Sequence, residues 1–287
     1  MVQSQVIIRT VLALLAFAGN SLLCRLALKT TAIDAASFTT IRMISATLVL
    51  SAILFASRKP PLMKGDWPSA TALFAYAAAF SLAYINLTAG TGALLLFGSV
   101  QMTMIGFGLL RGERFNLTQI GGLLLALAGL IGLVLPGLSA PPAISASLMI
   151  VAGIAWGIYS LRGRGATDPL AITTGNFLRT LTMTVLFSLT LIDSAHVDFR
   201  GATFAVASGA VTSGIGYAVW YSVLPSLKAT QAATLQLAVP VIAALGAVLL
   251  LGETASLRLL LASLAILGGV ALVIYQKQKS TPIKARP

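Results

Sequence analysis

The feature that most constrains this chain is a series of ten long apolar stretches, separated by short polar turns, that fills nearly all of residues 6–275. A membrane-spanning helix needs about 20 mostly apolar residues, and each stretch approaches that length. The composition agrees, because 57% of the 287 residues are hydrophobic and only 9% are charged. The runs are continuous rather than alternating, so we expect an all-α membrane protein and not a β-barrel. The expected spans are residues 6–28, 33–56, 67–87, 92–110, 117–136, 143–161, 169–191, 201–223, 229–251 and 257–275.

The last five stretches repeat the pattern of the first five. Gly112-Glu113 follows the fourth stretch and Gly252-Glu253 follows the ninth, and each pair leads into a helix rich in glycine and alanine. An odd number of crossings per repeat inverts one half relative to the other, which is typical of secondary transporters. We therefore predict ten transmembrane helices, arranged as two inverted five-helix repeats around a central cavity. The predicted segments are a first repeat at 1–137, a second repeat at 138–276 and a basic cytoplasmic tail at 277–287.

The net charge of +12 is distributed unevenly over the predicted loops. With a cytoplasmic N-terminus, most of the loop lysines and arginines fall on the cytoplasmic side, whereas Arg25, Lys29, Arg200 and Arg258 fall outside. This bias follows the positive-inside rule. It predicts a multi-pass protein of the cell inner membrane with both termini in the cytoplasm. It also accounts for the positive charge without a nucleic-acid partner.

Acidic residues are absent from the middle of every predicted span, and the single histidine, His196, falls in an outer loop. Proton-coupled exporters of organic cations commonly use a buried carboxylate that carries the proton and pairs with the cation. The absence of such a group favours a facilitator that moves solute down its own gradient. The sequence also lacks a metal-ligand cluster, a nucleophile motif and a phosphate-binding loop, so we expect no enzyme activity, no cofactor and no metal.

The doubled five-helix unit, the two Gly-Glu steps and the glycine-rich helix after each step resemble the EamA family of the drug/metabolite transporter superfamily. The element Leu237-x-x-Pro240 also matches that family, although Val100 stands at the equivalent of Pro240 in the first half. The segment from Gly92 to Thr103 is most similar to YddG-type amino-acid exporters. The resemblance implies ten helices, cytoplasmic termini, a cavity between the halves, and amino acids or related metabolites as cargo.

Arg42 and Arg179 lie about nine or ten residues into their helices, and hence roughly 14 Å deep at 1.5 Å per residue. An uncompensated guanidinium at that depth costs about 3 kcal/mol, so each arginine needs partners or water. In one interpretation both arginines bind a substrate carboxylate, whose two oxygens match the guanidinium fork. In the other, each ties together helix carbonyls or loops of its own half. The presence of one arginine in each repeat favours the structural role.

Aromatic residues suggest a binding surface. Tyr76, Phe80 and Tyr84 follow the spacing i, i+4, i+8, Tyr217 lies on the corresponding helix of the second half, and Trp156 lies on the sixth helix. Rings with polar tips would suit amphipathic cargo such as an amino acid. The alternative is the aromatic belt that many membrane proteins place at the lipid interface.

Amide side chains inside the spans supply candidate hydrogen-bonding groups. Asn20, Gln101 and Gln236 are expected to face the cavity and bind substrate, although hydrogen bonding between helices is the alternative for each. Gly19, Gly157 and Pro240 are candidate hinges, because small residues and proline let a helix bend. Close helix packing is the alternative for the glycines.

Three functions are compatible with these patterns. The favoured one is an inner-membrane exporter of amino acids, aromatic and other neutral ones above all, that works by alternating access as a facilitator. The second is an exporter of drugs or of other metabolites such as nucleosides or sugar phosphates, with or without proton coupling. The third is a membrane enzyme or receptor, for which the sequence offers neither a catalytic constellation nor a signalling domain. The expected partners are a small-molecule substrate and the lipid bilayer, and the oligomeric state is left open, with a monomer allowed.

Overall fold

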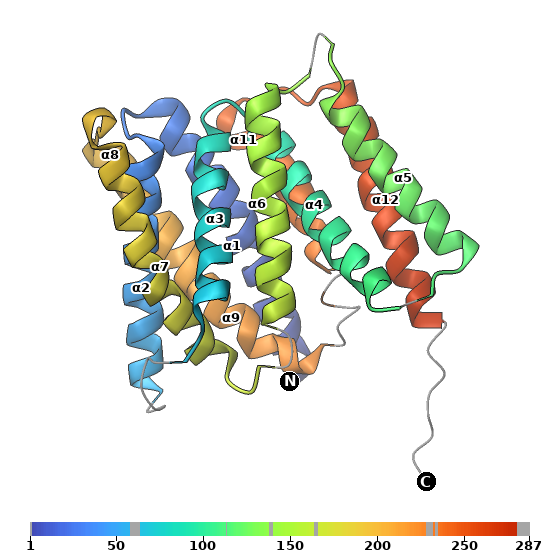
Figure 1. Cartoon of the computed structure of the whole chain (residues 1–287), viewed down its shortest axis with the longest axis horizontal. Coiled ribbons are helices and arrows are strands. Elements are labelled where there is room, and N and C mark those ends of the chain that lie inside the picture. The colour runs from blue at the N-terminus through green and yellow to red at the C-terminus, as the bar shows by residue number, and fades with distance from the viewer. Residues whose placement is uncertain are drawn as a thin grey trace.

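The computed structural model describes residues 2–57, 64–112, 114–137, 140–163, 166–227, 232 and 235–279. Within them helices joined by short loops make up the chain, and no strand is formed (Figure 1). Glu113 and residues 280–287 of the predicted tail lie outside the described residues. The helices are α1 (Val2–Thr30), α2 (Ala35–Ala56), α3 (Trp67–Tyr84), α4 (Ala89–Leu110), α5 (Leu117–Val134), α6 (Ala143–Arg162), α7 (Pro169–Thr190), α8 (Phe199–Ala207), the π-helix η2 (Ser208–Ile215), α9 (Gly216–Val223), α11 (Ala238–Leu251) and α12 (Leu257–Lys279), with short 3₁₀ turns η1 (Ile192–Ser194) and η3 (Leu224–Ser226).

Because α8, η2 and α9 follow one another without a break, the described residues form ten helical rods. The rods coincide with the ten expected spans within a few residues at most ends. The ninth is described only from Ala238, whereas residue 229, its expected start, lies outside the described residues.

Acidic side chains begin many of the helices. Asp34 accepts hydrogen bonds from the backbone N–H groups of Ala36 and Ser37 at the start of α2. Asp66, Asp168 and Asp198 cap α3, α7 and α8 in the same way. A carboxylate at this position satisfies N–H groups that the first helical turn leaves unpaired. The predicted placement of acidic residues at helix ends therefore has a structural cause.

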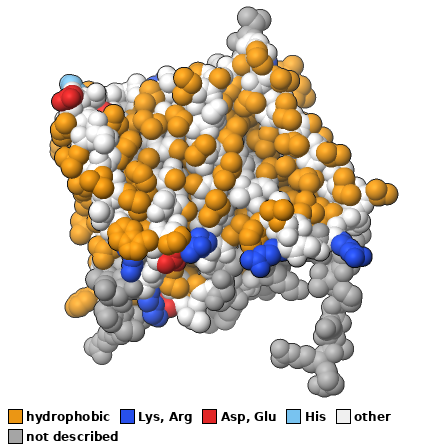
Figure 2. Space-filling view, in the orientation of Figure 1, with side chains coloured by type: hydrophobic (Ala, Val, Ile, Leu, Met, Phe, Trp, Pro, Cys, Tyr) orange, Lys and Arg blue, Asp and Glu red, His pale blue; other side chains and the backbone are white. Residues whose placement is uncertain are grey.

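Seven rods are long and apolar enough to cross a membrane, judged by length and composition over the described residues. The other three are α3, α7 and α11. Polar Asn176 and Arg179 make α7 less apolar, and α11 is described over only 14 residues. Figure 2 shows a broad apolar area across the face of the molecule, and strongly exposed apolar side chains such as Phe55 and Leu117 match contact with lipid. The chain is a multi-pass membrane protein.

The helices pack in pairs that join the two halves of the chain. α2 packs on α7, α4 on α11, and α5 on α12, while α3 packs on α6 and α1 on α9. In Figure 1, α5 and α12 form an inclined pair at the right of the view, beside a bundle of the other helices. We call the bottom of this view, where α1 begins and α12 ends, the lower end, and the opposite side the upper end.

Candidate functional site

A cavity of about 480 Å³ lies inside the bundle and is bounded by helices of both halves. It extends to the loop after α6 and the turn after α9, which lie at the lower end. None of its lining side chains, among the residues described, is charged. The lining residues are Phe17, Asn20, Ser21, Tyr76, Phe80, Leu96, Phe97, Gln101, Met104, Trp156, Tyr159, Ser160, Gly163, Ala166, Pro169, Thr212, Ser213, Tyr217, Trp220, Tyr221, Leu224, Leu227, Ala232 and Gln236.

Aromatic rings form a continuous wall of this cavity. The ring centre of Trp156 lies 4.8 Å from that of Tyr76 and 5.4 Å from that of Tyr217. Phe17 meets Tyr217 edge-on at 5.8 Å and Trp220 at the same distance. Such tilted and edge-on pairs hold one another in place. The wall therefore presents rigid apolar surface with a few hydroxyl and indole donors.

A chain of side-chain hydrogen bonds crosses the cavity wall from the second half of the protein to the first. The Ser208 hydroxyl of η2 donates to Asn20 Oδ1 of α1 at 2.7 Å. Asn20 Nδ2 in turn donates to the Tyr76 hydroxyl oxygen of α3 at 3.0 Å. Asn20 and Tyr76 both line the cavity, so the chain fixes two polar groups at its surface.

The structure brings most of the predicted binding residues together. Six of the nine line the cavity, and these are Asn20, Tyr76, Gln101, Trp156, Tyr217 and Gln236. The remaining three are Tyr84, Arg42 and Arg179, none of which is part of the lining. Tyr84 is fully buried beyond the cavity, and its hydroxyl donates to the Ala89 carbonyl oxygen at 3.3 Å.

Arg42 lies directly behind the cavity wall. Only 1% of its surface is exposed, and its guanidinium carbon lies 5.5 Å from the ring centre of Tyr76 and 5.1 Å from that of Phe80. These contacts place a positive charge over two ring faces. Nε and Nη1 of Arg42 find no hydrogen-bond partner among the described residues. The side chain therefore approaches the cavity without opening onto it.

Arg179 has a different environment. Its Nη1 donates to the carbonyl oxygens of Lys64 at 3.0 Å and of Gly175 at 2.9 Å. The neighbouring Asn176 accepts a hydrogen bond from the backbone N–H of Asp66 at 2.9 Å. Together these bonds tie α7 to the segment that leads into α3. This position matches the alternative in which Arg179 holds carbonyls and loops together.

A second hollow of about 270 Å³ adjoins the cavity at the lower end and shares Tyr159 and Tyr221 with it. Here Arg162 Nη2 pairs with Asp66 Oδ1 at 2.9 Å. Partial burial raises the pKa of Asp66, but hydrogen bonds from Ser69 and the charge of Arg162 more than offset this and hold the pKa below its ordinary value. The lower mouth of the cavity is therefore polar.

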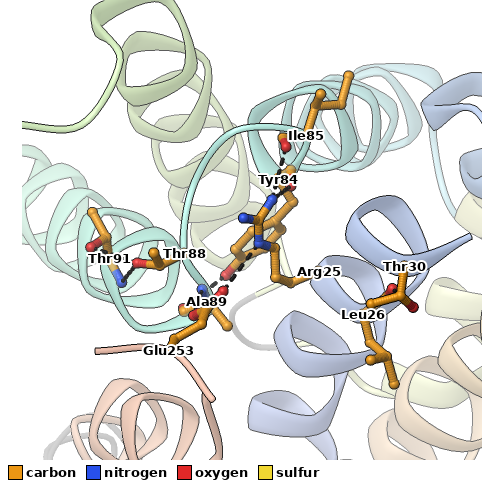
Figure 3. Close-up of polar contacts among 9 residues, drawn as sticks. All are labelled: Arg25, Leu26, Thr30, Tyr84, Ile85, Thr88, Ala89, Thr91 and Glu253. Carbon is orange, nitrogen blue, oxygen red and sulfur yellow. Dashed lines mark hydrogen bonds and ion pairs between the residues drawn. The ribbon is translucent and has the colours of Figure 1, made fainter. Parts of the chain in front are cut away.

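Beyond the other end of the cavity, a largely buried ion pair joins α1 of the first half to the segment that follows α11 in the second half (Figure 3). Arg25 of α1 donates through Nε to Glu253 Oε1 at 3.1 Å, and the side chains are 11% and 4% exposed. Ser21, one turn before Arg25 on the same helix, lines the cavity. The ion pair thus lies one helical turn outside the cavity, toward the upper end.

Backbone groups complete this cluster. Arg25 Nη1 donates to the carbonyl oxygens of Tyr84 at 2.9 Å and Ile85 at 2.8 Å, at the end of α3. Glu253 Oε2 accepts from the backbone N–H of Ala89 at 2.8 Å, at the start of α4. An anion at a helix N-terminus and a cation at a helix C-terminus are both favourable. The sequence indicated Glu253 through its repeated Gly-Glu step, but it gave no signal that Arg25 would be the partner.

The three predicted hinge residues lie in close contacts. A side chain at Gly157 of α6 would meet Thr103 Cβ of α4 at 2.8 Å, and one at Gly19 would meet the Thr212 methyl group at 3.3 Å. Pro240 is buried in the first turn of α11. At Gly19 and Gly157 the contacts fit the packing alternative, and a role of any of the three in bending stays a prediction.

Comparisons with known proteins agree on a transporter family. The sequence model of the EamA-like transporter family matches residues 5–135 and again residues 143–275. An uncharacterized protein of Pseudomonas aeruginosa is 57% identical over 266 residues, which make up 92% of this chain and 93% of that protein. A protein of Streptantibioticus cattleyicolor named "Probable terminal-alkyne amino-acid exporter" is 28% identical over 213 residues, 71% of this chain and 70% of its own length.

A solved crystal structure of another protein has a similar fold. Its superposition gives a TM-score of 0.66 and covers 95% of this chain and 98% of that chain, with 20% sequence identity. At this identity the likeness concerns the fold alone.

Proposed function

Since the chain belongs to the EamA-like transporter family, we propose that it exports amino acids, aromatic and other neutral ones above all, and related metabolites across the inner membrane. The observation that carries this proposal is the cavity of about 480 Å³, walled by aromatic rings, furnished with hydroxyl and amide groups, and lined by no charged side chain among the described residues. Its volume lies within the usual range of small-molecule sites. One amino acid with a large side chain fits such a space.

The proposed mechanism is alternating access between two inverted five-helix repeats, with boundaries at residues 1–137 and 138–276. The pairing of helices supports this symmetry. α2 with α7, α4 with α11 and α5 with α12 each join equivalent positions of the two halves, and the packing of α3 on α6 has its counterpart in α1 on α9. If each helix is replaced by its equivalent in the other half, the same helix pairs are obtained. A twofold axis between the two repeats requires this.

In this mechanism the structure represents the state open toward the lower end, which we assign to the cytoplasm. Lysine and arginine side chains gather along the lower edge of the face in Figure 2, which supports that orientation by the positive-inside rule. The Arg25–Glu253 cluster closes the upper end. Release of cargo to the outside requires this cluster to separate.

The absence of a charged lining side chain among the described residues also supports a facilitator. A proton-driven cycle usually needs a titratable group at the cargo site, and the acidic residues that the structure describes lie at helix ends or in loops. Cargo moving down its own gradient needs no such group.

Counterflow in liposomes tests the proposal. Purified protein is reconstituted into vesicles loaded with an unlabelled amino acid, and uptake of the labelled compound is measured for neutral, aromatic, acidic and basic amino acids, with nucleosides and cationic drugs as the alternative cargos. We expect uptake of neutral and aromatic amino acids that does not depend on an imposed pH gradient.

A cavity variant and a matched surface variant test whether cargo passes through the cavity. Tyr217→Ala is expected to change the ranking of the cargos, whereas Leu124→Ala, at an exposed apolar position on α5, is expected to leave it unchanged. Uptake that strictly requires a proton gradient would overturn the facilitator. Transport of nucleosides or drugs without amino acids would overturn the assigned cargo.

A further inference from the structure

We propose that Tyr76, backed by the buried charge of Arg42, forms a carboxylate subsite in the cavity. This inference rests on the proposed function and makes it more specific: the cargo must carry a carboxylate, which docks on α3. The observations that carry it are the hydrogen-bond chain from Ser208 to Tyr76 and two guanidinium nitrogens of Arg42, Nε and Nη1, that have no hydrogen-bond partner among the described residues.

The first step concerns the hydrogen of the Tyr76 hydroxyl. Asn20 Oδ1 accepts from the Ser208 hydroxyl at 2.7 Å, which turns the Asn20 amide nitrogen toward Tyr76. That nitrogen donates to the Tyr76 oxygen at 3.0 Å. A phenol donates one hydrogen bond and accepts others. With the Tyr76 oxygen already accepting, the hydroxyl hydrogen is the group left to donate to a ligand in the cavity.

The second step concerns charge. Arg42 is buried beneath the rings of Tyr76 and Phe80, both of which line the cavity, and no carboxylate pairs with it among the described residues. A buried guanidinium is costly unless an anion or hydrogen bonds compensate it. An anionic group held at Tyr76 would supply this compensation through the ring layer. Arg42 is thus a positioning residue that acts through Tyr76 and not by direct contact.

The third step concerns selectivity. The described lining offers a donor and a nearby positive charge but no carboxylate. Such a site attracts a zwitterion or a monoanion by its carboxylate end and disfavours an amine that lacks one. The rings of Trp156 and Tyr217 then contact the rest of the cargo.

Four related compounds separate these contributions in reconstituted vesicles: phenylalanine, phenylpropionate without the ammonium group, phenethylamine without the carboxylate, and phenylalaninamide with the carboxylate masked. Each competes with labelled phenylalanine for counterflow. Because hydrogen bonds to charged groups contribute about 1.5–3 kcal/mol, we expect the compounds that carry a carboxylate to compete roughly tenfold to hundredfold better than the amine and the amide.

Variants of the hydrogen-bond chain test whether Tyr76 and Asn20 cause the preference for compounds that carry a carboxylate. Tyr76→Phe keeps the ring, removes the hydrogen and should abolish most of the preference without weakening competition by phenethylamine. Asn20→Asp replaces the amide donor by an acceptor that takes the Tyr76 hydrogen, and should act in the same way. Tyr84→Phe is the matched control, because Tyr84 lies outside the cavity lining and its hydroxyl already donates to the Ala89 carbonyl oxygen at 3.3 Å; the preference of this variant should equal that of the unmodified protein.

Two substitutions, one that removes the positive charge of Arg42 and one that keeps it, test the role of that charge. Arg42→Gln should reduce the carboxylate preference and Arg42→Lys should retain part of it; if neither variant folds, the Tyr76 and Asn20 variants decide. An unchanged preference in Tyr76→Phe overturns the subsite, and so does equal competition by phenethylamine in the unmodified protein. These results leave the proposed function intact as long as labelled phenylalanine is transported. A protein that transports no amino acid overturns the proposed function itself.

Discussion

At the scale of single residues, two buried arginines illustrate opposite ways of holding a charge inside a membrane protein. Arg25 pairs with Glu253 and donates to two carbonyl oxygens. Arg42 has aromatic rings beside it and unpartnered nitrogens among the described residues. A paired charge stabilises one arrangement of helices, whereas a cation without a carboxylate partner behind the cavity wall can act on a ligand through Tyr76. We assign the first to closure of the upper end and the second to cargo selection.

Glu253→Gln is predicted to destabilise the closed arrangement. Removing one partner of a buried ion pair leaves the other charge uncompensated and typically costs about 3–5 kcal/mol. We expect a lower midpoint of thermal unfolding in detergent. The control is Arg200→Gln, which removes a charge at an exposed position of the same end. A double change of Arg25 and Glu253 to Met should recover most of the loss, and an unchanged midpoint in Glu253→Gln would contradict the role of the pair.

Asp66 gives a prediction for pH. Its pKa is lowered in the folded protein, so its bonds to Ser69 and Arg162 contribute stability at neutral pH that is lost as the pH falls through the folded value. We expect Asp66→Asn to weaken the loss of stability that occurs as the pH falls from about 5 to below the ordinary carboxyl pKa of 3.8. The measurement is the unfolding midpoint as a function of pH. Asp193→Asn, at an exposed site, should leave the pH profile as it is, and an equal effect of both variants would contradict the assignment.

Six of the nine binding residues predicted from the sequence line the cavity, and Tyr84 is one of the three that do not. Spacing of i, i+4, i+8 placed Tyr76, Phe80 and Tyr84 on one face, yet eight residues advance a helix by about 80° past whole turns at 3.6 residues per turn. Tyr84 consequently leaves the cavity and bonds to Ala89. Ser208 and Phe17 were missed, because a serine or phenylalanine in an apolar span carries no distinctive pattern.

At the scale of helices, the pair α5 and α12 depends on close backbone approach. A side chain at Gly122 would meet the Gly269 carbonyl oxygen at 2.6 Å, and Gly269 in turn faces the backbone of Gly122. In lipid no hydrophobic driving force holds helices together. Small residues stabilise a helix pair because they allow such close packing. The glycine-rich helix after each Gly-Glu step is therefore half of an interface.

Gly122→Val is predicted to separate α5 from α12. Overpacking of a tight contact typically costs about 1–3 kcal/mol, so the unfolding midpoint should fall. The matched control is Gly121→Val, since a Cβ added at Gly121 meets nothing within 4 Å. Equal stability of the two variants would show that this interface contributes little.

The helix starts were predictable where caps mark them, as at Asp34, Asp66 and Asp168. The π-helix from Ser208 to Ile215 was not, because nothing in SGAVTSGI distinguishes it from an ordinary apolar turn. A wide turn of this kind is set by contacts with neighbouring helices. Here Gly209 lies against the Arg42 carbonyl oxygen of α2, where no side chain fits.

At the scale of the whole molecule, the positions of the two ends of α7 decide the proposed topology. Thr167 precedes α7 and Ala195 follows it, and both are described. α7 is not among the seven most evident spans, so composition alone does not establish that it crosses the membrane. The inverted arrangement needs this helix to cross.

Single cysteines at the two positions test the crossing. In a Cys24→Ala background, which removes the one native thiol, Thr167→Cys should react with an impermeant maleimide only from the cytoplasmic side. Ala195→Cys should react only from outside. Intact cells and inverted vesicles provide the two directions, and a buried site such as Ala152→Cys serves as an unreactive control. Labelling of both from one side would refute the topology.

The eight-residue π-helix has one more consequence for the rod that carries it. A π-helix turns less per residue than an α-helix. It therefore determines the direction in which the side chains of α9, including Tyr217 and Trp220, point from the axis of the rod. If residues 208–215 rewound into ordinary helical turns, both rings would rotate about the axis of the rod. Because Tyr217 and Trp220 both line the cavity, such a rotation would change its shape.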